Sequence, residues 1–147
     1  MNWKIKSFES LSKQELYQIL QVRNEVFIVE QKTYYQDLDD KDFGAMHLFL
    51  EDEQHAILAY CRIMPKGVTY AECCIGRVLT KPTARQHGYG RVLFQKALDF
   101  IEQEWQENSV RISAQCYLQT FYASFGFVPI GTEYLEDDLP HIEMLKS

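Results

Sequence analysis

The spacing of hydrophobic positions predicts a mixed α/β fold, built as a single domain over residues 1–147. Alternation with a period of two, or a short apolar run between turn residues, predicts strands at 3–8, 46–51, 56–64, 70–80, 110–115, 127–130 and 141–145. Helical spacing predicts helices at 13–30, 91–105 and 118–125. We therefore expect six or seven strands and three to four helices.

Local signals mark several element boundaries. Ser12 and Glu15 form a capping box at the start of the first long helix, and Gly126 stands where a C-terminal cap belongs. Polar residues 52–55 predict a hairpin turn, and acidic residues 133–138 predict another turn. The succession of strand, helix and strand in the middle of the chain predicts a right-handed crossover between parallel strands.

The stretch 73–105 joins an apolar strand, a glycine-bearing turn and an amphipathic helix. Gly88 and Gly90 lack a Cβ atom, so the turn can adopt a positive φ and a ligand can lie against bare backbone. The first turn of the helix leaves N–H groups without partners, and Arg85 and Arg91 flank it. These features predict a phosphate site, with an ordinary strand–turn–helix connection as the alternative. The glycine spacing matches no Walker A loop and no complete dinucleotide-binding motif.

Composition narrows the choice of partners and compartment. Apolar residues make up 46% of the chain, enough for a folded core. The net charge of −6 disfavours nucleic acid and anionic membranes as partners, and it permits a cationic substrate. No apolar run is long enough to span a bilayer, and the first residues lack a signal-peptide core, so we expect a cytoplasmic protein without a membrane partner.

The cysteines and acidic residues predict no metal site. The cysteines sit in apolar runs without the paired spacing of zinc ligands, which indicates buried structural thiols: Cys61, Cys73, Cys74 and Cys116. Asp37 and Asp39 begin like a calcium loop, but Lys41 occupies a ligand position. The acidic loop at 31–45 is then either a solvated surface or a lip that attracts a cationic substrate, with Tyr35 as part of its wall.

Two motifs together resemble the GNAT superfamily of N-acetyltransferases. Residues 85–90, Arg-Gln-His-Gly-Tyr-Gly, match its acyl-CoA-binding signature, in which Arg or Gln is followed by two spaced small residues. Residues 121–127, Phe-Tyr-Ala-Ser-Phe-Gly-Phe, match its second hallmark, F-Y-x-x-x-G-F. The wider chain is similar to the ElaA-like subgroup through segments 26–31, 35–39, 75–78 and 140–142.

The resemblance implies a fold and a reaction. The fold is a mixed sheet whose two central parallel strands splay into a V that admits acyl-CoA. The reaction is direct transfer of an acetyl group from acetyl-CoA to a primary amine of a small molecule or peptide. We expect a monomer or homodimer, with no nucleic acid among its partners. A catalytically silent domain that senses acyl-CoA or binds a partner is the alternative, and the acidic charge disfavours nucleic-acid modification.

The resemblance also implies the residues that bind the cofactor. The strand end is expected to face the thioester and pantetheine, with a bulge that frees one N–H group, through Val78, Leu79 and Thr80. The loop and helix start are expected to hold the pyrophosphate, through Arg85, Gln86, His87, Gly88, Tyr89, Gly90 and Arg91. Among these, the His87 ring is expected to face solvent. Gln119 is a further candidate for a hydrogen bond to the cofactor.

Tyr122 matches the position of the family's phenol, and we expect it to protonate the departing thiolate. The alternative is an interfacial aromatic residue whose hydroxyl has a structural partner. The general base is open between Glu30, which we place in the catalytic set, Glu72 and a chain of water molecules. Glu72 lies one residue away from the family's strand glutamate, so its side chain points to the other face.

The residues expected to line the acceptor pocket are Tyr35, Asp37, Arg62, Arg77 and His141. Arg77 stands in an otherwise apolar central strand, where a charge needs a partner. That partner is either a ligand or, in a purely structural role, a carboxylate such as Glu72 or Asp37.

Overall fold

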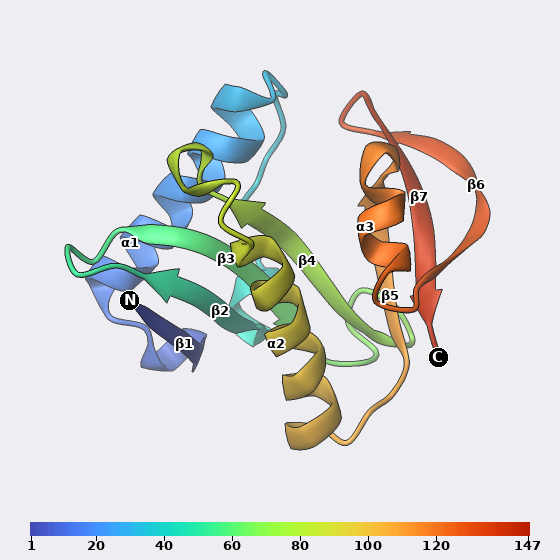
Figure 1. Ribbon diagram of the computed structural model, residues 1–147, viewed down its shortest axis with the longest axis horizontal. Helices are drawn as coiled ribbons and strands as arrows, with labels where there is room; N and C mark the ends of the chain where they lie inside the picture. The colour runs from blue at the N-terminus through green and yellow to red at the C-terminus, as the bar shows by residue number, and fades with distance from the viewer.

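A seven-stranded mixed sheet organises the chain in the computed structural model, which describes residues 1–147 (Figure 1). The strand order is β1-β2-β3-β4-β5-β7-β6. The strands are β1 (Asn2–Ser7), β2 (Met46–Glu51), β3 (Ile57–Met64), β4 (Cys73–Thr80), β5 (Val110–Gln115), β6 (Val128–Glu136) and β7 (Leu139–Lys146). Only β4 and β5 pair in parallel, and all other neighbours are antiparallel. The predicted mixed α/β fold is confirmed.

Three α-helices connect the strands: α1 (Lys13–Arg23), α2 (Tyr89–Glu104) and α3 (Gln119–Ala123). A π-helix, η2 (Asn24–Glu30), continues α1, and short 3₁₀ turns complete the chain: η1 (Phe8–Ser10), η3 (Lys41–Gly44), η4 (Pro82–Ala84) and η5 (Cys116–Leu118). The predicted capping box is present, because the Ser12 side chain accepts from the Glu15 N–H and the Glu15 carboxylate accepts from the Ser12 N–H.

The two central strands separate soon after they pair. Cys73 pairs with Val110 and Cys74 with Arg111, and the ladder between β4 and β5 ends there. Figure 1 shows β4 and β5 diverging from this point. The expected V-shaped opening is therefore confirmed, and it divides the sheet into a β1–β4 half and a β5–β7 half.

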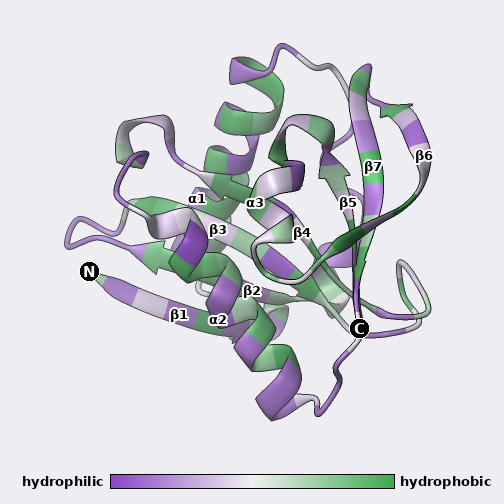
Figure 2. Ribbon diagram, turned by 45° about the vertical axis from the view of Figure 1, so that its right-hand side comes forward, coloured by the Kyte–Doolittle hydropathy of each residue, from purple (hydrophilic) through white to green (hydrophobic).

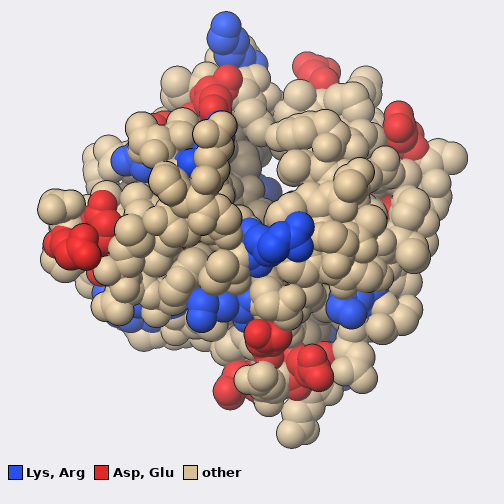
Figure 3. All heavy atoms as spheres, in the orientation of Figure 1, with Lys and Arg blue, Asp and Glu red and all other residues tan.

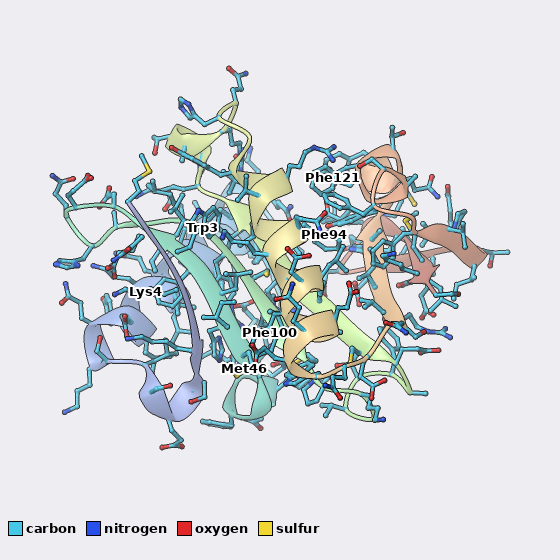
Figure 4. The ribbon with its side chains drawn as sticks, turned by 60° about the horizontal axis from the view of Figure 1, so that its bottom comes forward. Trp3, Lys4, Met46, Phe94, Phe100 and Phe121 are labelled. Carbon is cyan, nitrogen blue, oxygen red and sulfur yellow. The ribbon has the colours of Figure 1, made fainter.

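Helices α1 and α2 pack on different cores. Leu93, Phe94, Ala97 and Ile101 of α2 join a cluster of 19 buried residues that includes the facing side chains of the central strands. Ile19 and Val22 of α1 join a smaller cluster with residues of β2, β3 and β4. Figure 4 shows the rings of Phe94 and Phe121 meeting between α2 and α3, with their centroids 6.2 Å apart. Figure 2 shows the alternation of hydrophobic and hydrophilic residues along β7.

Two expectations about the elements are wrong. Residues 133–136 belong to strand β6, and only the short stretch before β7 is a turn. β6 is an edge strand, so its acidic side chains can face solvent while its backbone pairs with β7. The first helix is not α-helical throughout, because its last seven residues widen into the η2 π-helix, a feature often found at functional sites.

Candidate active site

The start of α2 presents unpaired N–H groups to solvent. Gly88 adopts the predicted positive φ, 75°, and no side chain caps the helix. The first helical hydrogen bond runs from Val92 N to Gly88 O, which leaves the N–H groups of Tyr89, Gly90 and Arg91 without helical partners. Gly90 lies within the helix and has no positive φ, so the feature that suits it to a bound ligand is the absence of a Cβ atom. The N-terminus of this helix has the geometry of an anion site.

Arg85 does not reach freely into this site. Its guanidinium donates to both carboxylate oxygens of Glu30, at 2.7 and 2.6 Å, and its Nε donates to Thr80 O at 3.1 Å. Arg91 has no carboxylate partner and lies over the rings of Phe121 and Phe125, 5.4 and 5.0 Å from their centroids. Of the two arginines beside the loop, Arg91 is the one that carries no ion pair.

The Glu30–Arg85 pair also bears on the choice of general base. The hydrogen bonds from Arg85 hold the pKa of Glu30 below its usual value. A carboxylate with a lowered pKa is a weaker proton acceptor, and Glu30 lies outside the central cavity described below. Glu72 is bound to the Arg111 side chain, at 2.9 and 3.2 Å. Neither geometry supports a catalytic base, and the role of Glu30 stays a prediction.

Strand β4 carries the expected bulge. Tyr60 pairs with Leu79 and Arg62 with Gly76, so Arg77 and Val78 together stand opposite one residue of β3. Arg77 has a left-handed φ of 51°, which is unusual for a residue with a side chain. A bulge of this kind leaves a strand residue outside the hydrogen-bond ladder, beside the opening of the V.

A central cavity of about 330 Å³ lies between the two halves of the sheet. Figure 3 shows the molecule hollowed between these halves. Five predicted site residues line it together with Val78: Tyr35, Arg62, Arg77, Tyr122 and His141. Asp37 lies behind this surface and is not part of the lining. The remaining residues proposed for the cofactor, including Gln119 and the 85–91 loop, lie outside the cavity.

Three aspartates of the acidic loop, Asp37, Asp39 and Asp42, form ion pairs with arginines, whereas Asp40 is exposed to solvent. Arg77 Nε donates to Asp37 Oδ1 at 2.8 Å, which shows that the partner of Arg77 is Asp37 and not Glu72. Arg62 donates to both oxygens of Asp39, at 2.7 and 2.6 Å. Burial alone would raise the pKa of Asp39, but the hydrogen bonds from Arg62 hold it well below its usual value.

A third arginine, Arg23, also binds the acidic loop. Arg23 is fully buried and donates to Asp37 Oδ2 at 2.9 Å and to Asp42 Oδ1 at 2.7 Å. Three arginines (Arg23, Arg62 and Arg77) therefore neutralise three aspartates (Asp37, Asp39 and Asp42), and we call this set the Arg–Asp network. Three of its residues, Asp39, Arg62 and Arg77, line the central cavity, and each charge in the network has an opposite partner.

Tyr122 is buried except where its hydroxyl reaches the central cavity. Only two buried side-chain polar atoms lack a hydrogen-bond partner, Gln18 Oε1 and Arg62 Nε. The Tyr122 hydroxyl makes no hydrogen bond within the chain and is not one of them, so it is open to the cavity. Burial raises the pKa of Tyr122, which keeps the phenol protonated. The structural partner that the alternative interpretation requires is absent.

Sequence reasoning missed the surroundings of His141. His141 Nε2 lies 3.4 Å from Glu136 Oε2, and the ring stacks on Tyr134. Ser113 Oγ approaches both the Tyr134 hydroxyl and, at 3.3 Å, the Glu136 carboxylate. A strand predicted over residues 128–136 would have placed Glu136 and Tyr134 beside His141, but the acidic residues at its end favoured a turn at 133–138.

Comparison with known proteins fits this geometry. The sequence model of the acetyltransferase (GNAT) domain matches residues 9–147. The chain is 36% identical to Escherichia coli ElaA over 148 residues, which covers 100% of this chain and 97% of ElaA. It belongs to the GNAT acetyltransferase family, in the ElaA-like subgroup. As a member of this family, whose fold binds acyl-CoA, it is an acyltransferase.

Solved structures of this family have the same fold. An acyl-CoA N-acyltransferase from Pseudomonas aeruginosa is 39% identical and superposes with a TM-score of 0.94 over 100% of both chains. E. coli ElaA gives a TM-score of 0.92, again over 100% of both chains. A spermidine N-acetyltransferase from Vibrio cholerae, solved with CoA and spermine, gives 0.71 at 15% identity, covering 97% of this chain and 94% of the other, and shares the fold alone. None of the helices of the present protein is long and apolar enough to cross a bilayer.

Proposed function

We propose that this GNAT protein transfers the acetyl group of acetyl-CoA directly to a primary amine of a small molecule or peptide. One observation carries the proposal. An uncapped helix start and a cavity that exposes the Tyr122 hydroxyl lie beside the same opening between β4 and β5. Such an arrangement suits two substrates that meet at the splayed strands.

The residues around the opening fit a CoA thioester. The N–H groups from Gln86 to Arg91 suit a pyrophosphate, because no side chain caps the helix start and the helix dipole favours an anion there. Arg91 is available to add a guanidinium, whereas Arg85 must first leave Glu30. His87 is exposed, as expected, and contributes backbone. Val78, Leu79 and Thr80 supply the strand edge, and Gln119 supplies a side-chain amide at the start of α3.

When bound, acetyl-CoA supplies an activated acetyl group as a thioester and accepts a proton when its sulfur departs. The N–H group freed at the β4 bulge can stabilise negative charge that develops on the acyl oxygen. The Tyr122 hydroxyl keeps its proton and points into the cavity, so it can protonate the sulfur. The Arg–Asp network is internally neutral and acts as a wall, which leaves the acceptor amine to be recognised by other groups.

The proposal is tested by titrating the purified protein with acetyl-CoA in a calorimeter and then measuring thiol release with a panel of primary amines. Saturable binding followed by amine-dependent thiol release supports the enzyme. Binding without thiol release on small amines or lysine peptides favours a silent acyl-CoA-sensing domain. Absence of binding contradicts the assignment of the 85–91 loop.

A further inference from the structure

An imidazole and a carboxylate share the wall of the central cavity opposite the Arg–Asp network. His141 Nδ1 lies 2.7 Å from Leu139 O, an acceptor, so Nδ1 carries the hydrogen. In the neutral ring, the lone pair therefore resides on Nε2, which lies 3.4 Å from Glu136 Oε2. Two acceptors face each other across this gap, an arrangement that a donor placed between them satisfies.

Neighbouring side chains hold this pair in place. Ser113 Oγ lies 3.3 Å from Glu136 Oε2 and also contacts the Tyr134 hydroxyl. The Tyr134 ring stacks on His141, with centroids 6.1 Å apart. The His141 side chain is 8% exposed and that of Glu136 is 50% exposed, so the imidazole is enclosed while the carboxylate meets the solvent. Substrate can reach the gap from the cavity, which both residues line.

Several other titratable groups of the central cavity, among them Tyr70, whose pKa burial raises, are poor bases. Asp39 is bound to Arg62, and its pKa is low. Burial raises the pKa of Tyr35 and of Cys74, each to about 12, so both stay protonated. Of the four histidines in the chain, only His141 lines the cavity. The remaining carboxylate in the lining, Asp137, stands exposed at the β6–β7 turn without a partner to orient it.

We propose that His141 is the general base that deprotonates the acceptor amine and that Glu136 positions the ammonium group of that acceptor. The inference rests on the proposed acetyl transfer. An ammonium nitrogen about 2.8 Å from both acceptors can donate one hydrogen to His141 Nε2 and one to Glu136 Oε2, which lie 3.4 Å apart. The charges of the Arg–Asp network on the opposite wall are paired with one another.

The protons of the reaction balance with these groups. The ammonium gives one proton to His141 Nε2, which later releases it to solvent. The nitrogen lone pair then forms the C–N bond as the C–S bond breaks. The Tyr122 hydroxyl gives its proton to the sulfur and regains one from the nitrogen, so the products are the amide, the thiol and one proton.

The fold brings this base to the acid. His141 pairs with Gln115, the last residue of β5, and paired residues point to the same side of a sheet. η5 follows Gln115 directly and leads into α3, which carries Tyr122. The imidazole and the phenol thus line one cavity from adjacent elements.

The test compares ethylamine with trifluoroethylamine in the thiol-release assay at neutral pH. Ethylamine is an ammonium there, since alkylamines titrate near a pKa of about 10.4, whereas the fluorinated amine is already neutral. His141→Asn keeps a donor for Leu139 O and removes the base. We expect its kcat/KM for ethylamine to fall by about 100-fold, and the ethylamine-to-trifluoroethylamine ratio to fall by at least about tenfold. Glu136→Gln is expected to lower the same ratio.

The matched control is Glu143→Gln. Glu143 lies on β7, the strand that carries His141, and its carboxylate binds Arg111 outside the cavity. Its ratio should equal that of the wild type. An unchanged ratio in His141→Asn, or an equal loss with both amines, overturns the proposal, because a structural role affects both alike. If the wild type turns over neither amine, the proposed acetyl transfer fails for simple amines. NMR then decides the site: ethylammonium should shift the His141 ring resonances in the wild type and not in Glu136→Gln, and absence of the wild-type shift refutes the site.

Discussion

The Arg–Asp network predicts a large loss of stability from one nearly isosteric substitution, Asp42→Asn. Asp42 is 7% exposed, and its Oδ1 accepts from Arg23 Nη1 at 2.7 Å and from Arg62 Nη1 at 3.1 Å. Arg23 is fully buried, so it cannot turn to water when it loses this partner. The asparagine keeps the shape of the side chain and removes only its charge.

The size of the effect follows from the partners that remain. Breaking a buried ion pair by removing one charge costs about 3–5 kcal/mol, because the other charge stays buried. Asp37 still binds Arg23 and Asp39 still binds Arg62, so we expect the lower end, about 3 kcal/mol. For a chain of this size, that corresponds to a Tm lower by roughly 6–12 °C.

Urea unfolding followed by circular dichroism measures this loss, with Asp40→Asn as the matched control. Asp40 is exposed, and its left-handed φ of 67° suits asparagine, so its variant should lie within about 0.5 kcal/mol of the wild type. Burial alone would raise the pKa of Asp42, but the hydrogen bonds from Arg23 lower it overall. The carboxylate therefore stabilises the fold above the unfolded pKa, near 3.8, and loses this contribution as the pH falls through the folded value. A difference below about 0.5 kcal/mol at neutral pH would refute the reasoning.

Three further predictions concern the loop, the phenol and the first helix. Gly90→Glu should weaken acetyl-CoA binding at least about tenfold in calorimetry by placing bulk and negative charge at the phosphate site, whereas Gly90→Ala, whose Cβ meets only an ordinary contact, should fold normally. Tyr122→Phe should lower kcat by about 100-fold and leave the Kd for acetyl-CoA nearly unchanged, and equal turnover across the pH range would remove the acid role. Burial alone would raise the pKa of Glu15, but hydrogen bonds from the Ser12 N–H, Lys6 and Lys4 lower it to about 2. Its carboxylate should therefore stabilise the fold above pH 4.5 and lose this contribution as the pH falls towards 2. Glu15→Gln should cost about 2 kcal/mol at neutral pH and much less in acid, and equal costs at both would contradict the assignment.

Local patterns in the sequence predicted what local physics determines. The capping box at Ser12, the left-handed Gly88 and the helix that follows it are confirmed, because each depends on a few neighbouring residues. The splayed strands and the bulge on β4 came from the resemblance to the GNAT family, and both are present.

The sequence left contacts between distant parts of the chain open: it named Asp37 and Glu72 as alternative partners of Arg77 and could not choose between them. Arg77 and Asp37 are separated by 40 positions, and only the folded sheet shows that the acidic loop closes over the arginines. The partner of His141 was missed because an edge strand tolerates acidic residues that are also typical of turns. Glu136 could therefore be assigned to a site only when the register of β6 against β7 was known.

The bulge at Arg77 connects the two substrate sites. Regular alternation would point Arg77 to the same face as Cys73 and Ile75, which are buried in the core under α2. The left-handed residue costs roughly 1–3 kcal/mol of backbone strain, and it turns the guanidinium instead to Asp37 on the other side. The same irregularity takes Val78 out of register beside the opening. A single distortion of β4 thus opens the strand edge where acetyl-CoA is proposed to bind and anchors the wall of the cavity where the amine is proposed to bind, so a change at Arg77 should disturb both sites together.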